Sequence, residues 1–365
     1  MSESNNSNTP LVSVTVCVRD GIEWVDNCLL SLVEQDWPNL EIIAVDDGST
    51  DGSTEKLQAW DDPEGIHNRH PVKVYTQTAK GLSAGRALAV EKSQGLWVAI
   101  TDIDVRAEPS WINELMRASQ SIDEKEHIVA VTGRTVFSPG EQIISKLRTS
   151  EIAEKYRNRP RITSLANGPC SIFLRQSLLD IGGFGEDWYH AEDMEVSLRL
   201  IEAGGTIVYS PEAVVNHVAE DRIGTFLSKR TRDARAHVRI IRNYPKRQRT
   251  IGFDFIGSAW WILMLFPSII LAIIGMYLFL SRIVIGTEDF YFSNTEHLFT
   301  LFCFLPAIIH ILNFPQTAIG SLLKLKKPFQ STKLLIILYL WSWSLWKGLA
   351  YGYLDALFGR NGHRR

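Results

Sequence analysis

The stretch Leu96-Trp97-Val98-Ala99-Ile100-Thr101-Asp102-Ile103-Asp104 places two carboxylates directly after an apolar run. Such a run is typical of a buried strand, and open α/β sheets bind their ligands at the carboxyl ends of strands. Asp102 and Asp104 repel each other unless a cation or hydrogen-bond donors share them. Hard oxygen ligands at this edge favour Mg²⁺ or Mn²⁺, although acidic pairs of this kind are also common in solvated loops.

Two earlier apolar segments indicate further buried strands. Residues 11–18 form the first and residues 40–45 the second, which runs into Asp46-Asp47-Gly48-Ser49-Thr50-Asp51. Gly48 permits a tight turn, and the polar residues after it can cap a following helix. A plain strand-turn-helix connection accounts for the segment from Gly48 onward. It does not account for two carboxylates at the strand tip, where like charges repel.

The hydrophobic pattern alternates between strand and helix up to residue 220. The expected strands lie near 12–18, 40–45, 72–76, 96–101, 127–132, 170–174 and 205–209. The expected helices lie near 22–35, 52–60, 83–93, 109–120 and 192–203. This alternation predicts an α/β fold with a mostly parallel sheet and helices on both faces.

Several ordered motifs resemble those of a family 2 glycosyltransferase of the GT-A fold. The resemblance covers roughly residues 11–220 and rests on the segments 13–20, 28–35, 45–51, 81–87, 102–104, 167–168, 182–184 and 191–200. It implies a mostly parallel mixed sheet and transfer of a sugar from a UDP- or GDP-linked donor. Nothing in the sequence implies a nucleic-acid partner.

The resemblance also implies roles for individual residues. Four residues would contact the nucleotide: Asp46, Asp47, Arg86 and Asp102. Asp104, with Asp102, would bind the Mg²⁺ or Mn²⁺ that neutralises the departing diphosphate. His217 matches a position where many relatives place a histidine close to the metal or diphosphate. A structural histidine with satisfied hydrogen bonds fits the sequence equally well.

Glu192-Asp193 opens an expected helix, where the helix dipole and free amides favour anions. Inversion at the anomeric carbon needs a base that faces the acceptor hydroxyl. In the family the second acid of this motif is the usual base, so the resemblance assigns catalysis to Asp193. Glu192 is either a second catalytic acid or a first-turn acid that only stabilises the helix.

Basic residues are concentrated in one segment, although the formal net charge of the chain is only −3. From Arg222 to Arg249 there are ten of them against one acid, Asp233. This segment is either a solvated face or a surface for anionic headgroups and phosphates, and its place before an apolar stretch favours the latter. Arg222 and Arg230 are candidates for diphosphate contacts. Residues 235, 239 and 242 are expected to form one cationic stripe against lipid.

Three apolar stretches follow the basic segment. Ala259 to Leu280 holds 22 uncharged positions, which is enough to cross a bilayer. Leu298 to Leu323 is broken by prolines, and Leu334 to Phe358 contains Lys347 and Asp355 together with many Trp and Tyr residues. The third stretch fits a spanning helix and an interfacial helix equally well.

The resulting domain prediction has five parts: a polar tail (1–10), a GT-A domain (11–220), a basic juxtamembrane region (221–257), a membrane domain of two to three transmembrane helices (258–358) and a basic tail (359–365). The first ten residues carry no signal-peptide pattern, so the catalytic domain is expected on the cytoplasmic face of a multi-pass protein, which the positive-inside rule also favours. Three full spans would place the basic tail outside, against that rule. Four cysteines without metal-ligand spacing are expected as free thiols.

Polysaccharide synthases of this family carry a Q-x-x-R-W motif, and residues 220–250 contain none. Transfer of a single sugar is therefore favoured over processive synthesis. A membrane anchor beside the site suggests a lipid-linked acceptor, either a polyprenyl phosphate or a saccharide on a polyprenyl diphosphate. A nucleotidyltransferase and a non-catalytic membrane scaffold are the alternatives of other classes. A nucleotidyltransferase would typically need a glycine-rich phosphate loop near the first strand, and the sequence has none. A scaffold would have no reason to keep acids at strand and helix ends.

Overall fold

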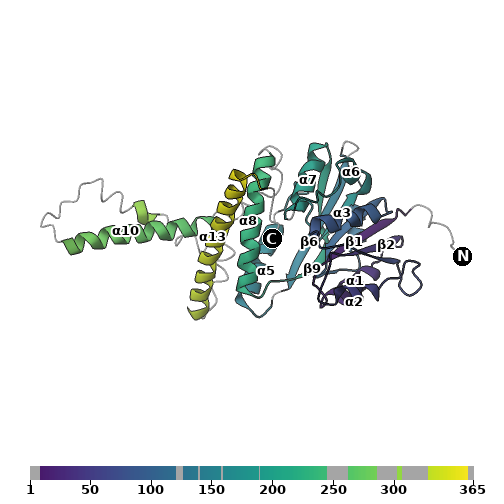
Figure 1. Cartoon of the computed structure of the whole chain (residues 1–365), viewed down its shortest axis with the longest axis horizontal. Coiled ribbons are helices and arrows are strands. Elements are labelled where there is room, and N and C mark those ends of the chain that lie inside the picture. Colours follow the sequence, from purple (N-terminus) through teal and green to yellow (C-terminus); the bar gives the residue numbers. More distant parts are fainter. Residues whose placement is uncertain are drawn as a thin grey trace.

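The computed structural model describes residues 9–120, 126–138, 140–157, 159–188, 190–244, 262–285, 302–305 and 328–360. The polar tail up to residue 8, most of the second apolar stretch and the end of the basic tail lie outside the described residues. Figure 1 shows an α/β domain at the N-terminal side and a group of long helices at the other.

One mixed sheet forms the centre of the α/β domain. Its strands are β1 (Val12–Val18), β2 (Leu40–Asp46), β3 (Val72–Thr76), β4 (Trp97–Asp102), β5 (Val105–Ala107), β6 (Ile128–Ser138), β7 (Ile162–Thr163), β8 (Ser171–Leu174) and β9 (Thr206–Val218). Their order is β3-β2-β1-β4-β8-β6-β9-β5, with β7 paired to β9. The first four strands run parallel, and β8 is antiparallel to both of its neighbours. The predicted α/β class and mixed sheet are confirmed. The sheet is less parallel than predicted, because four of its pairings are parallel and four are antiparallel.

Helices cover both faces of this sheet, so β1 and β2 are buried at every position. On one face, Val12, Val14 and Val16 pack with α1 (Val25–Val33), α2 (Ser53–Gln58) and α4 (Trp111–Ala118). On the other face, Cys17 packs with α3 (Leu82–Lys92). The same face carries α6 (Arg175–Asp180) and α7 (Glu192–Glu202) over β4 and β8. All four cysteines are free and buried.

Strand β9 is longer than the pattern predicted, since it continues through Pro211 to Val218. Its second half pairs with β5, and this pairing sets His217 opposite Val105. Asp104 directly precedes β5, so the pairing brings His217 beside the acidic pair. The sequence did not predict β5, β7, α5 (Ile143–Arg157) or this half of β9. A proline and an acid at 211 and 212 interrupt the apolar alternation that signals a strand.

Three long helices follow the sheet: α8 (Ile223–Asn243), α10 (Leu265–Ile285) and α13 (Pro328–Leu357). Figure 1 shows α8 and α13 side by side, with α10 pointing away from the α/β domain. Two glycines allow the close approach of α13 to α8. A Cβ at Gly348 would lie 2.2 Å from the carbonyl oxygen of Thr231, and one at Gly352 would lie 2.9 Å from that of Arg235. This small-xxx-small spacing lets helix backbones come together.

An ion pair fixes the same interface. The Arg235 guanidinium donates to both carboxylate oxygens of Asp355 on α13, at 2.5 and 2.7 Å. Arg239 lies over the Trp188 ring, 3.9 Å from its centroid. The expected stripe of three free cations is therefore wrong, because the first two are bound within the protein and only Arg242 is exposed.

Within the described residues, one helix is long and apolar enough to cross a membrane. It is the 25-residue part of α13 from Lys333 to Leu357, and 44% of its most apolar window is buried inside the protein. The apolar part of α10, Leu265–Ser281, is shorter than the ~20 residues that a span needs. The prediction of two to three spanning helices therefore reduces to one candidate among the described residues.

Enlarging either glycine of α13 should separate α13 from α8. We expect Gly348→Leu to lower the free energy of unfolding by ~1–3 kcal/mol, because the new side chain meets the backbone of Thr231 and not a movable side chain. Thermal unfolding in a mild detergent measures the effect. Leu357→Ala, at an exposed position of the same helix, is the control. Equal melting temperatures for the two variants would contradict this packing.

Candidate active site

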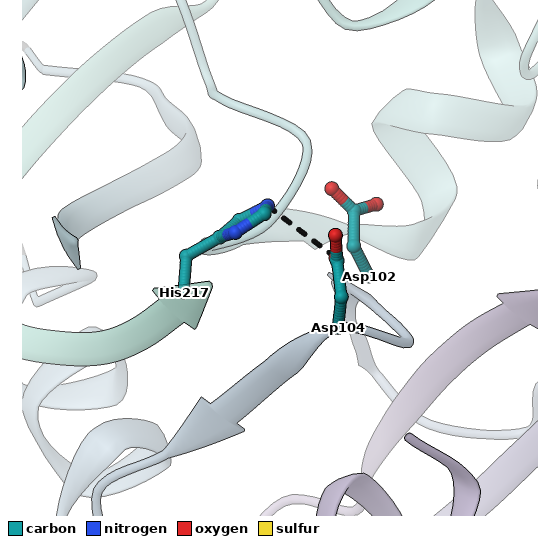
Figure 2. A group of neighbouring side chains, drawn as sticks. All are labelled: Asp102, Asp104 and His217. Carbon is teal, nitrogen blue, oxygen red and sulfur yellow. Dashed lines mark ion pairs between the residues drawn. The ribbon is translucent and has the colours of Figure 1, made fainter. Parts of the chain in front are cut away.

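Asp102, Asp104 and His217 form a compact group at the carboxyl edge of the sheet (Figure 2). One ligand atom from each lies within 4.8 Å of the others. Asp102 ends β4, Asp104 precedes β5, and His217 lies near the end of β9. The imidazole Nε2 of His217 is 3.3 Å from Oδ1 of Asp104. Three chain segments therefore contribute to one donor set of two carboxylates and an imidazole.

The orientation of His217 is fixed on two sides. Its ring stacks on Phe137 with centroids 4.6 Å apart and an angle of 13° between the planes. Its Nδ1 lies 2.8 Å from the carbonyl oxygen of Val218. A carbonyl only accepts hydrogen bonds, so Nδ1 carries the proton and the lone pair of a neutral ring sits on Nε2. This lone pair faces a carboxylate, and a shared proton or cation relieves the repulsion between them.

These residues fit a divalent metal. Carboxylate oxygens and an imidazole nitrogen whose other nitrogen donates to a carbonyl are a common ligand set for Mn²⁺. Burial raises the pKa of the Asp104 carboxyl, and the neighbouring Asp102 adds to the increase while His217 opposes it. A bound cation would reverse this effect, because it favours the ionised form of both acids. The group can thus hold a metal ion between the two carboxylates and His217.

Arg86 joins the acidic pair to helix α7. Its buried guanidinium donates to Asp102 Oδ1 at 2.8 Å and to Glu192 Oε1 at 2.5 Å. The two carboxylates outweigh the effect of burial and raise the pKa of Arg86, so it stays charged. A Cβ at Gly168 would lie 2.7 Å from the guanidinium. Only glycine at this position leaves room for Arg86.

Asp193 and Glu192 differ in what holds them. Asp193 accepts hydrogen bonds from the backbone amides of Gly168 (3.0 Å) and Met194 (2.8 Å) and stays partly exposed. Glu192 is buried against Arg86, and burial, with a smaller contribution from Asp193, raises its pKa above the ordinary range. Asp193 is therefore the acid that a substrate in this site can reach.

Asp46 and Asp47, at the end of β2, also differ in their hydrogen-bond partners. Asp47 accepts from the backbone amides of Lys80 and Gly81 and from Gln77, at 2.7–2.8 Å, and it borders a cavity. Asp46 is buried and accepts from Thr54 at 2.9 Å and from the amide of Ser49. It borders neither described cavity. Asp46 thus holds the turn after β2, and the structure does not bring it to the site as predicted.

Two cavities meet at the acidic pair. The first, of about 460 Å³, contains Asp47, Arg86, Asp102, Glu192 and Asp193 together with residues of α5 and α8. The second, of about 750 Å³, contains Asp104, His217 and Arg222. Arg230 borders neither cavity, because it lies on a buried side of α8 with its guanidinium 3.0 Å from Asp233. Of the two arginines predicted to contact a diphosphate, only Arg222 borders the cavity that contains Asp104 and His217.

Sequence reasoning did not single out several cavity residues. Arg19 was part of the first motif and lies 3.7 Å from Asp47. Arg232 was counted only as part of the basic segment. Lys155 lies on α5, a helix that the pattern did not predict because its apolar residues follow no clear period. No local motif marks Lys155, since its place depends on how α5 packs.

Glu220 anchors the segment that follows the metal group. Its carboxylate lies 3.5 Å from Nε of Arg148 on α5 and 3.1 Å from Nζ of Lys229 on α8. Arg148 in turn lies over the face of Phe137, which stacks on His217. Burial alone would raise the pKa of Glu220, but the surrounding cations outweigh it and lower the pKa to about 2. The ion pairs therefore hold the chain just after His217 to both helices.

Removal of the Asp104 carboxylate should abolish metal binding while the fold survives, because this side chain lies at a strand start and not in the apolar core. We expect Asp104→Ala to bind Mn²⁺ at least ~10²-fold more weakly than the wild type in titrations followed by electron paramagnetic resonance. Asp221→Asn changes an exposed acid of the second cavity and should bind Mn²⁺ normally. Unchanged affinity in Asp104→Ala would overturn the metal assignment.

The stabilising effect of Glu220 should depend on pH. The depressed pKa stabilises the fold above pH ~4.5, and this contribution is lost as pH falls toward 2. Glu220→Gln should therefore lower the free energy of unfolding by ~3 kcal/mol at pH 7 and by much less near pH 2.5. Denaturant unfolding across this range measures it, with the exposed Glu212→Gln as control. A deficit that does not change with pH would contradict an ion-pair role.

Comparisons with known proteins agree with this geometry. Residues 13–182 match the family model "Glycosyl transferase family 2". A "Putative glycosyltransferase EpsH" of Bacillus subtilis is 31% identical over 42% of this chain and 41% of its own length. "Poly-beta-1,6-N-acetyl-D-glucosamine synthase" of Staphylococcus epidermidis is 22% identical over 85% of this chain and 74% of its own length. The chain thus spans less than half of the EpsH-like relative.

One solved structure shares the fold of the chain over most of its length. It is the mannosyltransferase PcManGT of Pyrobaculum calidifontis in complex with GDP-Man and Mn²⁺, with a TM-score of 0.58 and 18% identity. The similarity covers 96% of this chain and 88% of that one. The family model and the curated relatives agree on the family, and the likeness to this solved structure shows the fold alone. Residues 13–182 are a glycosyltransferase family 2 domain within a GT-A-like fold.

Proposed function

We propose that the protein is a metal-dependent, inverting glycosyltransferase that moves one sugar from a UDP- or GDP-linked donor to a lipid-linked acceptor at a membrane. The observation that carries this proposal is the single edge of the sheet on which Asp102, Asp104 and His217 lie a few ångströms apart, with Asp193 in the adjoining cavity. A metal-ligand group and a reachable carboxylate are the two components that such a transfer requires.

The nucleotide would bind along the first cavity. Asp47 and Arg19 lie at the end of this cavity beside β1 and β2. The carboxyl ends of parallel strands are where open α/β sheets bind nucleotides. Arg86 would hold Asp102 in place beside the diphosphate, and Arg222 borders the cavity of Asp104 and His217. A Mg²⁺ or Mn²⁺ ion held by Asp102, Asp104 and His217 would neutralise the charge that develops on the departing diphosphate.

Asp193 would act as the base. Its two backbone hydrogen bonds fix the carboxylate at the start of α7 and leave it accessible from the cavity. There it can accept the proton of an acceptor hydroxyl as the bond to the anomeric carbon forms, which inverts the configuration. Glu192 is bound to Arg86, so we assign it the positioning of Arg86 and not proton transfer.

The membrane part of the proposal rests on α13. One side of this helix packs on α8, and its other side exposes apolar residues that include Ile336, Trp343, Tyr353 and Leu357. A helix of this length with a wide apolar exposed face is stable in lipid. Because α8 also borders the catalytic cavity, a membrane at α13 would lie near the acceptor side. A catalytic domain on the cytoplasmic face is part of the same proposal.

A processive polysaccharide synthase is the second candidate. The similarity to the N-acetyl-D-glucosamine polymer synthase over 85% of the chain favours it. The absence of a Q-x-x-R-W motif between residues 220 and 250 favours transfer of a single sugar. The two candidates predict different products, one added sugar or a distribution of lengths.

A donor panel tests the proposal. UDP- and GDP-linked sugars are incubated with the full chain in detergent, with an extract of polyprenyl-linked lipids, and with Mn²⁺ or chelator. Mass spectrometry of the lipids then reads the added mass. We expect one sugar added from one donor class, only with metal. Chains of several sugars would favour the synthase, and no metal-dependent use of any donor would refute the proposal.

Replacement of Asp193 by Asn keeps its shape but removes its ability to accept a proton. We expect binding of the Mn²⁺-nucleotide complex to persist and the transfer rate to fall by ~10²-fold or more, as is typical when a general base is lost. Isothermal titration and the transfer assay separate the two effects. Glu202→Gln, at an exposed acid of the same helix, should leave both unchanged. Loss of nucleotide binding with normal turnover of bound donor would make Asp193 a binding residue.

A further inference from the structure

The first cavity has two walls of opposite charge. Its sheet-side wall holds the acids Asp47, Asp102, Glu192 and Asp193, of which Arg86 compensates two. Another part of its wall comes from α5 and α8 and presents Lys155 and Arg232, and Asp233 follows Arg232 on α8. The proposed metal and base account for the acidic wall. The basic wall has no role in that chemistry.

Positive charge is concentrated behind this basic wall. Cations outnumber carboxylates there: Arg148, Lys155, Arg159, Lys229, Arg230 and Arg232 stand against Glu151, Glu220 and Asp233. The charges around Lys155 cannot move apart, because each is held in place. Arg148 donates to Glu151 at 2.6 Å, and the guanidinium of Arg159 lies 5.6 Å from the ring centroid of Tyr156 and 5.1 Å from that of Tyr209. Arg230 is buried beside Asp233.

This crowding affects Lys155 directly. Its side chain is half-buried on α5, and burial together with the charges of Arg148, Arg159 and Arg230 lowers its pKa to about 7. An ammonium kept in such surroundings is stabilised by an anion that enters the cavity. Perturbed titratable groups that border a cavity commonly mark binding or catalytic sites. Arg232 adds a guanidinium that is 40% exposed, with its Nε 3.5 Å from Asp233.

We propose that Lys155 and Arg232 form an oxyanion subsite that binds a phosphate group of the acceptor. The subsite rests on the proposed function, since it names the charge that the acceptor carries. The nucleoside of the donor is assigned to the end of the first cavity at Asp47 and Arg19. Its diphosphate is assigned to Asp102, Asp104 and His217, of which the last two border the other cavity. The basic wall shares its cavity with Asp193, so an anion held there lies on the acceptor side of the transferred sugar. A guanidinium and an ammonium together suit the oxygens of a phosphate.

Binding measurements on the full chain in detergent test the subsite. The probes are farnesyl phosphate, farnesol and inorganic phosphate, each titrated calorimetrically, and GDP or UDP with Mn²⁺ titrated separately. We expect the wild type to bind farnesyl phosphate at least ~10-fold more tightly than farnesol. Lys155→Met and Arg232→Gln should each remove most of this preference, whereas Lys155→Arg, which keeps the charge, should retain it.

Matched controls come from the same helices. Lys146→Met on α5 and Arg242→Gln on α8 remove exposed cations that border neither cavity, and both should bind farnesyl phosphate as the wild type does. Inorganic phosphate that competes as well as farnesyl phosphate would still place the oxyanion at this wall but would show that the lipid chain adds nothing. Melting temperatures of all variants confirm that they are folded.

Two results would overturn the subsite. One is equal binding of farnesyl phosphate by the wild type and by both Lys155→Met and Arg232→Gln. The other is a parallel loss of Mn²⁺-nucleotide binding in those variants, which would assign the wall to the donor. The proposed function fails separately: a chain that binds farnesyl phosphate through Lys155 but binds no nucleotide with Mn²⁺ keeps the subsite and loses the transferase.

Discussion

The buried guanidinium of Arg86 is the contact on which the rest of the site depends. It ties the end of β4 to the start of α7 through one carboxylate from each, Asp102 and Glu192. Without the cation between them, the carboxylates of Asp102 and Glu192 would repel each other, and Asp102 would no longer be held in place. The glycine at 168 is required by the same contact, because any side chain there would overlap Arg86. The backbone amide of Gly168 in turn holds Asp193. One buried cation therefore positions both the metal side and the base side of the cavity.

The parts of this arrangement that the sequence predicts are those encoded locally. Strands β2 and β4 are largely apolar runs that end in acids, so both their existence and the edge on which Asp47 and Asp102 lie follow from the pattern. Helix α7 begins at Glu192 as expected. The pattern fails where pairing over a long range decides the structure. His217 joins the acids only because β9 continues past Pro211 and pairs with β5, and the sequence indicated its place by family resemblance alone.

Side-chain contacts separate residues that look alike in the sequence. Asp46 and Asp47 are neighbours at a strand end, yet one holds its own turn and the other borders the cavity. Arg222 and Arg230 belong to the same basic segment, yet only the first borders the cavity of Asp104 and His217. In both cases the sequence gives the residue type and the fold decides which way the side chain points. A difference of one residue on a strand, or of eight on a helix, places similar charges in unrelated surroundings.

Helix α8 explains why the C-terminal helices and the cavity at the sheet edge cannot be treated as separate units. One side of α8 supplies Arg232 and His237 to the cavity wall. Another side receives α13 through Gly348, Gly352 and the pair of Arg235 with Asp355. A helix with both sides packed has few free positions, so Arg235 and Arg239, two of the three residues expected to face lipid, are instead bound within the protein. The position of the cavity wall is then set by the packing of an apolar helix. The shape of the first cavity therefore depends on how α13 packs against α8.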